Sequence, residues 1–147
     1  MVLQGLAKAR ERASALINID VADLPAATKF YCQALGLTVG RRLGKTAIEL
    51  VGASAAIYLL AKPAGSPATA TIGQRRDYAR HWTPVHLDFV VRDIDAALKL
   101  ARAAGAVLEG EIGKHKWGRI ALMADPFGNG FCLVQFLGRG YDEVGKA

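Results

Sequence analysis

Cysteine is scarce in this chain of 147 residues, which contains only Cys32 and Cys132. Two cysteines are too few for the disulfide framework that stabilises many small secreted domains. The first residues also lack the apolar run of about 7–15 residues that marks a secretory signal. Residues 1–12 instead mix Leu and Ala with Lys and Arg, which predicts an exposed or docking helix. We therefore expect two free thiols and a cytoplasmic protein.

Long apolar runs are missing as well. Apolar residues make up 52% of the sequence but occur in short runs. None of these runs approaches the roughly 20 residues that a membrane-spanning helix needs, so we expect no membrane partner. The length suits one domain covering residues 1–147, whereas either half, at about 60 residues, would be marginally stable alone.

Acidic residues are fewer than basic ones, 13 against 19, which gives a formal net charge of +6. Such a surplus can mark a nucleic-acid-binding protein, in which Lys and Arg cluster on one surface or motif. Here the basic residues form three small clusters, around Arg10, Arg42 and Arg76, and acidic residues interrupt the set. We therefore expect no nucleic-acid partner. The surplus either keeps the surface solvated or attracts an anionic small ligand.

The chain does contain an internal repeat. Asp93 lies 70 positions after Asp23, and Lys99 lies 70 positions after Lys29, within similar surroundings. Two long copies indicate a pseudo-symmetric domain, because neither copy buries its apolar face without the other. We place the first module at about residues 15–61, the linker at 62–84 and the second module at about 85–137.

Both modules are predicted to follow the order β-α-β-β-β. In the first, residues 16–22 alternate as in a half-buried strand, and Asp23 and Gly36 are typical caps for the helix between them. Three strands are predicted to follow at residues 37–43, 46–51 and 55–61. The second module repeats the order at residues 85–92, 93–104, 106–112, 117–124 and 130–136. The linker is rich in Pro and Gly, with a helical turn predicted around residues 74–80.

One face of the two first strands is the candidate functional surface. Their alternate apolar residues should pack under each module's own helix. The opposite face then carries Asn18 and Asp20 in the first module and His86 and Asp88 in the second. Such polar groups need a partner, water or a ligand, because burying one unpaired costs about 1–3 kcal/mol.

These features resemble a known superfamily. Three short motifs are similar to those of the vicinal oxygen chelate superfamily. They are V-x-D-[LI] after each first strand, Leu35-Gly36-Leu37 after the first helix, and D-P-F-G-N-G-F before the last strand. This superfamily contains glyoxalase I, bleomycin-resistance proteins, fosfomycin-resistance enzymes and extradiol dioxygenases. The resemblance covers about residues 15–137. It implies an α+β fold of two tandem βαβββ modules forming a cupped mixed sheet, commonly in a homodimer, with a small-molecule ligand in the cup.

The resemblance also implies positions for a metal, on the first and last strands of each module. The first-strand positions are Leu16 and His86, and the last-strand positions are Tyr58 and Cys132. Leu16 cannot bind a metal, and neutral Tyr58 is a poor ligand because its pKa lies near 10. His86 and Cys132 alone are fewer than the three or four ligands of a zinc site. We therefore expect no cofactor, while a divalent metal held by His86 and Cys132, with Asp88 or Asp20 as a substitute ligand, stays open.

We predict His86 and Asp88 as catalytic residues, and as ligand-binding residues Asn18, Asp20, Tyr58, Trp117 and Cys132. Structural roles are the alternatives: His86 can be satisfied by Asp88 or Asn18, and Cys132 can be a small core residue. Glu49 resembles a superfamily carboxylate but is expected one strand too early.

Three functions follow. The first is a glyoxalase or bleomycin-resistance-like protein that binds a small molecule without the usual metal. The alternative is a metal-dependent lyase, isomerase or dioxygenase that uses His86. The third is an interaction protein whose cup is filled by its own side chains. A fold alone does not choose between them.

Overall fold

The computed structural model describes residues 12–146. The predicted helix over residues 1–12 therefore lies almost entirely outside the described residues. Among residues 12–146, no helix combines the length and the apolar composition needed to cross a membrane.

The first module has the predicted order of elements. It contains β1 (Ile17–Val21), α1 (Leu24–Leu35), β2 (Thr38–Leu43), β3 (Ala47–Val51) and β4 (Ile57–Ala61). The four strands form one sheet in the order β1-β4-β3-β2. β1 and β4 run parallel, and the other neighbours are antiparallel. This is a mixed sheet, with α1 as the crossover between β1 and the rest.

The second module repeats this arrangement with one addition. It contains β5 (Leu87–Val90), α2 (Ile94–Ala104), β6 (Val107–Leu108), β7 (Gly113–His115), β8 (Gly118–Ala124) and β9 (Gly130–Phe136), followed by a 3-10 turn, η1 (Gly140–Glu143). The sheet order is β5-β9-β8-β6, and β7 also pairs with β8. The single strand predicted over residues 106–112 is wrong. Gly110, with φ 91°, turns the chain between β6 and β7 in a conformation that glycine adopts without strain.

The predicted caps are confirmed in both helices. The Asp23 carboxylate accepts a hydrogen bond from Ala26 N at 2.9 Å. The Asp93 carboxylate accepts from Asp95 N and Ala96 N at 3.0 and 3.1 Å. Such caps satisfy amide groups that the first helical turn leaves free.

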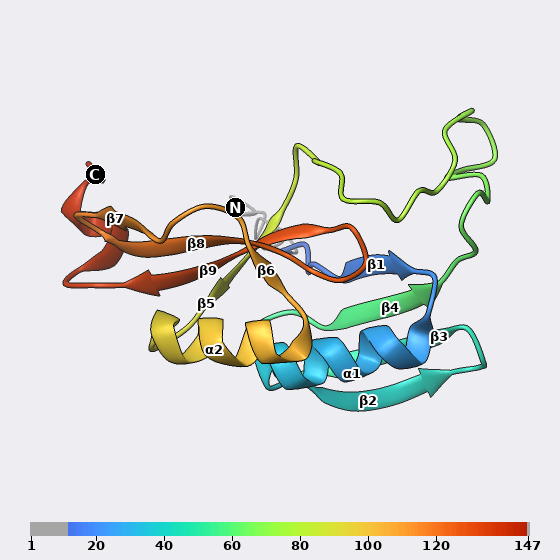
Figure 1. The fold of residues 1–147 in the computed structure, drawn as a ribbon, viewed down its shortest axis with the longest axis horizontal. Coiled ribbons are helices and arrows are strands. Elements are labelled where there is room, and N and C mark those ends of the chain that lie inside the picture. Colours follow the sequence, from blue (N-terminus) through green and yellow to red (C-terminus); the bar gives the residue numbers. More distant parts are fainter. Residues whose placement is uncertain (1–11, 147) are drawn as a thin grey trace, which may run out of the picture.

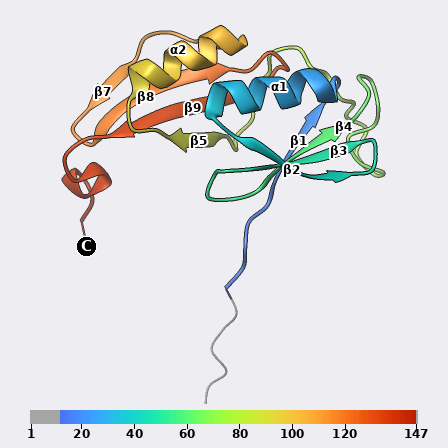
Figure 2. The same ribbon diagram turned by 90° about the horizontal axis from the view of Figure 1, so that it is seen from below.

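The two modules share one hydrophobic core. In Figures 1 and 2, α1 and α2 lie side by side on the same side of the molecule. Phe30 of α1 contacts Phe127 and Phe131 of the second module, with ring centroids 5.9 and 6.5 Å apart. The Tyr31 hydroxyl donates to Asp125 Oδ2 at 2.5 Å. Helix α1 therefore connects the first module to the loop and strand that end the second.

The linker is held to both modules. Arg76 Nε donates to Asp20 Oδ2 at 2.6 Å in the first module. Arg80 pairs with Glu109 in the second module, through contacts of 2.6 and 2.9 Å. The linker leaves β4, extends away from the sheets and returns to β5 (Figure 1).

The helical turn predicted around residues 74–80 is wrong. Gly65 N donates to Arg76 O at 2.8 Å, and Arg76 N donates to Ser66 O at 2.9 Å. Pro67 and Arg75 form an isolated antiparallel bridge. Backbone groups paired across the linker in this way are no longer available for the local bonds of a helix.

Candidate functional site

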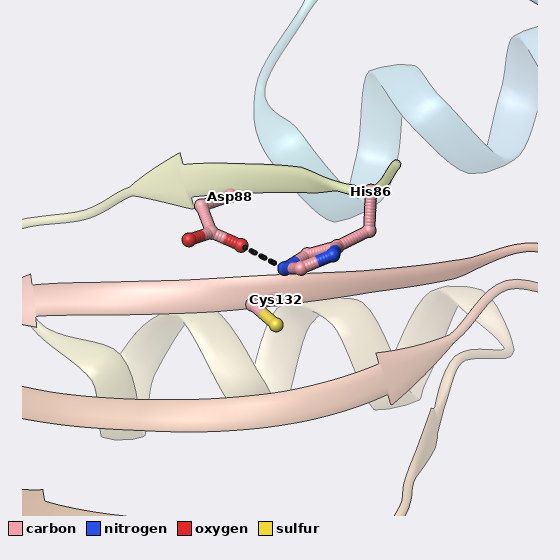
Figure 3. Close-up of side chains that lie close together, drawn as sticks. All are labelled: His86, Asp88 and Cys132. Atoms are coloured by element: carbon pink, nitrogen blue, oxygen red, sulfur yellow. Dashed lines mark ion pairs between the residues drawn. The ribbon is translucent and has the colours of Figure 1, made fainter. Parts of the chain in front are cut away.

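His86, Asp88 and Cys132 lie together on the open face of the second sheet. Asp88 in β5 pairs in register with Cys132 in β9, so both side chains leave the same face of adjacent strands. His86 precedes β5 and is two residues from Asp88, which places it on that face as well. One donor atom from each of the three lies within 4.8 Å of the others. Figure 3 shows the His86 and Asp88 side chains and the neighbouring Cys132 thiol.

The three side chains differ in solvent exposure. His86 and Asp88 are 53% and 38% exposed, and His86 Nε2 lies 3.3 Å from Asp88 Oδ1. Cys132 is buried, yet it leaves the opposite face of β9 from the core residues Phe131 and Leu133. It therefore lines the candidate site and not the shared core.

The Cys132 thiol is protonated at neutral pH. Burial, and then the charge of Asp88 and a hydrogen bond to it, raise the pKa of Cys132 to about 11. A reactive cysteine needs the opposite shift, because the thiolate is the nucleophile. The nearby His86 therefore does not produce a reactive thiolate in the free protein.

Two cavities adjoin these residues. The larger is a cleft of about 1010 Å³ lined by both first strands and the linker. Asn18, Asp20 and His86 line it, but the Asp20 carboxylate is already paired with Arg76. The smaller cavity, of about 130 Å³, is lined by His86, Cys132 and the linker residues Arg80 and Trp82.

The first module carries a different polar cluster on its open face. Tyr58 in β4 is opposite Glu49 in β3, which confirms that Glu49 is one strand too early for the superfamily position. Glu49 is buried and forms an ion pair with Arg41. Arg41 Nη2 also donates to the Tyr58 hydroxyl at 3.2 Å.

Two residues of these surroundings could not be inferred from the sequence. Arg41 lies where the pairing of β2 with β3 shifts register, between Val39 and Arg42. Such a bulge changes which residues share a face. Gly40 is a local signal of the bulge, but it does not show which side chains Arg41 reaches. Trp82 lines both cavities because of the path of the linker, which depends on distant ion pairs.

Trp117 lies apart from the other predicted site residues. It stacks on His115, with ring centroids 4.9 Å apart and planes 3° apart, and contacts Phe136 and Tyr141. It lines neither of the two cavities. The structure thus brings His86, Asp88 and Cys132 together, places Asn18 and Asp20 along the larger cleft, and leaves Tyr58 with Arg41.

Comparison with known proteins supports the architecture. The sequence model of a glyoxalase-like domain matches residues 16–134. A search of curated proteins found no significant match.

Solved structures share the fold at low sequence identity. The fosfomycin resistance protein FosX from Listeria monocytogenes has a TM-score of 0.65 and 18% identity, covering 87% of this chain and 96% of its own. A glyoxalase/bleomycin resistance protein/dioxygenase family enzyme from Burkholderia phytofirmans has a TM-score of 0.65 and 20% identity, with coverages of 83% and 97%. A glyoxalase-related enzyme from Fulvimarina pelagi has a TM-score of 0.65 and 18% identity, with coverages of 85% and 88%. This chain belongs to the glyoxalase-like domain family, within the vicinal oxygen chelate superfamily.

Proposed function

We propose that this chain binds a small organic molecule in the cleft between its first strands and the linker, without the two-module metal centre of its superfamily. The observation that carries the proposal is the cleft itself, of about 1010 Å³ and lined from both modules. Small-molecule sites are concave and mostly apolar, with a few polar groups that orient the ligand. The cleft has apolar walls at Ile17, Ile19 and Phe89, and polar groups at Asn18 and His86.

The residues at the superfamily metal positions do not fit a metal shared by the two modules. Leu16 has no donor atom, and the Tyr58 hydroxyl is bound to the guanidinium of Arg41. A metal at Tyr58 would lie beside this cation, and like charges at close range repel. Ligand binding by uncharged and hydrogen-bonding groups needs no such metal.

The cavities also oppose the idea of a cup filled by the protein's own side chains. Both cavities adjoin His86, where a filled cup would leave no space. Trp82 is 79% exposed beside them, and an exposed aromatic ring favours stacking on a ligand.

Thermal-shift screening tests the proposal. The purified chain, treated with a chelator, is screened against small aromatic, carboxylic and carbonyl compounds. We expect at least one compound class to raise the melting temperature, because a ligand that binds only the folded state stabilises it. His86→Ala should weaken the shift, whereas His115→Ala, outside both cavities, should leave it unchanged. Equal loss in both variants, or no shift with any class, would contradict the proposal.

A second candidate function is supported by the His86–Asp88 pair. A carboxylate 3.3 Å from the imidazole can orient it and support it as a general base in a lyase or isomerase reaction. In that case His86→Ala abolishes turnover and Asp88→Asn reduces it, while both variants keep the fold. A metal-dependent form of this chemistry, or a dioxygenase, would need a metal held by second-module residues alone, at His86 and Cys132 with Asp88 as a further ligand.

We further propose a cytoplasmic homodimer. The open sheet faces expose large apolar side chains, including Leu16, Val90 and Leu122. Apolar groups gathered on one side of a monomer commonly mark an interface. A light-scattering mass twice that of one chain is expected, and a mass near 15.6 kDa would contradict this proposal.

A further inference from the structure

We propose that Arg41 and Tyr58, on the open face of the first module, bind the carboxylate group of a small acid with an apolar body. The Arg41 side chain is 70% exposed, and its Nη2 donates to the Tyr58 hydroxyl at 3.2 Å. Neither residue lines the cleft between the first strands and the linker. The site therefore goes beyond the small-molecule function proposed for the cleft and does not depend on it.

A row of polar side chains crosses the first sheet at this point. Tyr58 of β4 is paired with Asn18 of β1 on one side and with Glu49 of β3 on the other, so the three side chains leave the same face. Arg41 of β2 extends the row, because its Nε forms an ion pair with the Glu49 carboxylate. Exposed apolar side chains flank the row on the same face, namely Leu16, Leu43 and Val51. A ligand on this face can therefore meet a charged group and an apolar surface together.

Glu49 fixes the orientation of the guanidinium. This carboxylate is only 8% exposed, and it accepts a hydrogen bond from Arg41 Nε. Gly40 allows the chain to pack closely at this point, because an added Cβ would lie 3.2 Å from Val51 Cγ1 and 3.4 Å from Glu49 Cδ. An arginine that is already held in one orientation loses less side-chain freedom when it binds a ligand.

The two side chains still have donors to offer. A guanidinium carries N–H donors on Nε, Nη1 and Nη2. Within residues 12–146, the hydrogen bonds of Arg41 use Nε and Nη2, and none uses Nη1. The Tyr58 hydroxyl accepts from Arg41, so its own hydrogen remains to donate. Arg41 and Tyr58 can therefore donate together to one anionic group.

Charge and geometry both favour a carboxylate. Residues 41–49 contain Arg41, Arg42 and Lys45, with Glu49 as their only acid, so the surroundings stay net positive. The planar edge of a guanidinium matches the two oxygens of a carboxylate. The apolar side chains beside the row suit the body of an organic acid, whereas inorganic phosphate has no apolar part to place there.

Titration of the full chain with sodium benzoate tests this site. The NMR resonance of the Arg41 Nε–H group, identified by its absence in Arg41→Lys, reports binding at the site itself. We expect this resonance to shift saturably with benzoate, and added salt to weaken the binding because salt screens exposed charges. Benzamide has the same ring without the charge, so it should bind about tenfold more weakly.

Matched variants identify the residues, with affinities measured by ligand-observed NMR. Arg41→Lys keeps the charge but removes the planar edge, so benzoate affinity should fall about tenfold. Tyr58→Phe removes one donor and should lower the affinity about three- to tenfold. Arg42→Gln is the control, because Arg42 pairs with Ile48, which faces the core. It should change the affinity by less than about twofold.

A double variant guards against loss of the fold. Arg41→Gln alone leaves the buried Glu49 charge without its partner, which destabilises a protein. Combining Arg41→Gln with Glu49→Gln removes both charges, and the circular dichroism of this double variant should match that of the parent chain. It should bind benzoate no better than the parent chain binds benzamide.

The opposite results would overturn the site. These are no shift of the Arg41 resonance with benzoate, equal affinity for benzamide, tighter binding of inorganic phosphate, or full benzoate affinity in Arg41→Lys. Benzoate binding that is lost in His86→Ala but kept in Arg41→Lys would place the acid in the cleft, so it would overturn this site and support the proposed function. Loss of binding in Arg41→Lys alone would support this site whether or not the cleft binds a ligand.

Discussion

Asp125 is a buried carboxylate with four hydrogen-bond donors around it. Phe127 N and Asn129 N donate at 2.8 Å, Asn129 Nδ2 donates at 3.0 Å, and the Tyr31 hydroxyl donates at 2.5 Å. The first three bonds shape the loop before β9, and the fourth comes from the other module. A buried carboxylate needs such partners, because desolvation otherwise opposes its charge.

Replacing Tyr31 by Phe should destabilise the protein. The variant removes one of four donors to Asp125, so we expect the free energy of unfolding to fall by about 1–2 kcal/mol. Urea unfolding at neutral pH measures this change. Tyr78→Phe is a suitable control, because the Tyr78 hydroxyl only reaches the Lys62 carbonyl in an exposed position. An equal loss of unfolding free energy in both variants would show that the Tyr31–Asp125 hydrogen bond between the modules adds no special stability.

Tyr31 should also make stability depend on alkaline pH. Burial, followed by the charge of Asp125 and the hydrogen bond to it, raises the pKa of Tyr31 well above its ordinary value. The unfolded chain releases this proton near pH 10, while the folded chain retains it. The contribution of Tyr31 to the free energy of unfolding should therefore stay constant below about pH 10 and decrease above it. Unfolding at several alkaline pH values should show a shallower fall in Tyr31→Phe than in the parent chain.

The sequence predicted the sheet face on which each site residue lies better than it predicted the side chain with which that residue pairs. Alternation placed His86 and Asp88 on one face, and the superfamily resemblance placed Cys132 together with His86. Asp20 was predicted on the same kind of face, but its pairing with Arg76 depends on how a loop of Pro and Gly folds. Periodicity describes strands, and it carries no information about which loop side chain reaches them.

The linker is the element that most determines the shape of the cleft. Its backbone passes close to the loop before β9, where His81 N donates to Gly128 O at 3.1 Å. A Cβ atom on Gly128 would lie 2.5 Å from the Ala79 carbonyl oxygen, and Gly128 has φ 92°. Only glycine allows both this contact and this backbone conformation.

Gly128→Ala should therefore displace the linker and destabilise the fold. Steric overlap with backbone and an unfavourable φ together predict a loss of about 2–4 kcal/mol. Gly44→Ala is the matched control, because Gly44 has φ 63° but no atom within 4 Å of the added Cβ. It should lose only about 1–2 kcal/mol. Denaturant unfolding compares the two, and equal losses would show that linker contact does not matter.

Arg76→Gln should loosen the linker. Arg76 contacts Asp20, Ser66, Pro67 and Ala68, so its loss should cost about 1–3 kcal/mol and speed proteolysis within residues 62–84. Arg75→Gln should do less, because Arg75 has a single exposed bond to the Gly65 carbonyl. In an Asp20→Asn background the effect of Arg76→Gln should shrink, because the two residues are coupled. Full additivity of the two substitutions would contradict this.

Regular elements were predictable, and irregular ones were not. Helix α1 begins after Asp23 and ends before Gly36 as predicted, because caps act locally. The β6 strand and the linker departed from prediction for different reasons. Gly110 ended β6 early, and cross-linker backbone bonds replaced the helical turn.

The whole molecule should unfold as one cooperative unit, because Phe30 of α1 packs against the second module. Phe30→Ala removes a ring that contacts both modules, so we expect a loss of about 3–5 kcal/mol. Unfolding should remain a single transition in the parent chain, with circular dichroism and fluorescence changing together. Two separated transitions in the parent chain would contradict a shared core.

The repeat predicted the architecture. The two copies differ mainly in the side chains on the open faces of their sheets. The second module places a histidine, a carboxylate and a thiol where the first places an aliphatic side chain, an amide and an arginine-bound phenol. Duplicated backbones require similar cores and caps, because these maintain the fold. They place no such requirement on exposed faces, so the two faces differ chemically.

The two tryptophans differ in their surroundings, so the intrinsic fluorescence of the protein can report the binding of a ligand. Trp82 is 79% exposed beside both cavities, whereas Trp117 is stacked among His115, Phe136 and Tyr141. Emission from Trp82 should therefore resemble that of indole in water and respond to any ligand that enters either cavity. Emission from Trp117 should stay constant and provide an internal reference in the same spectrum.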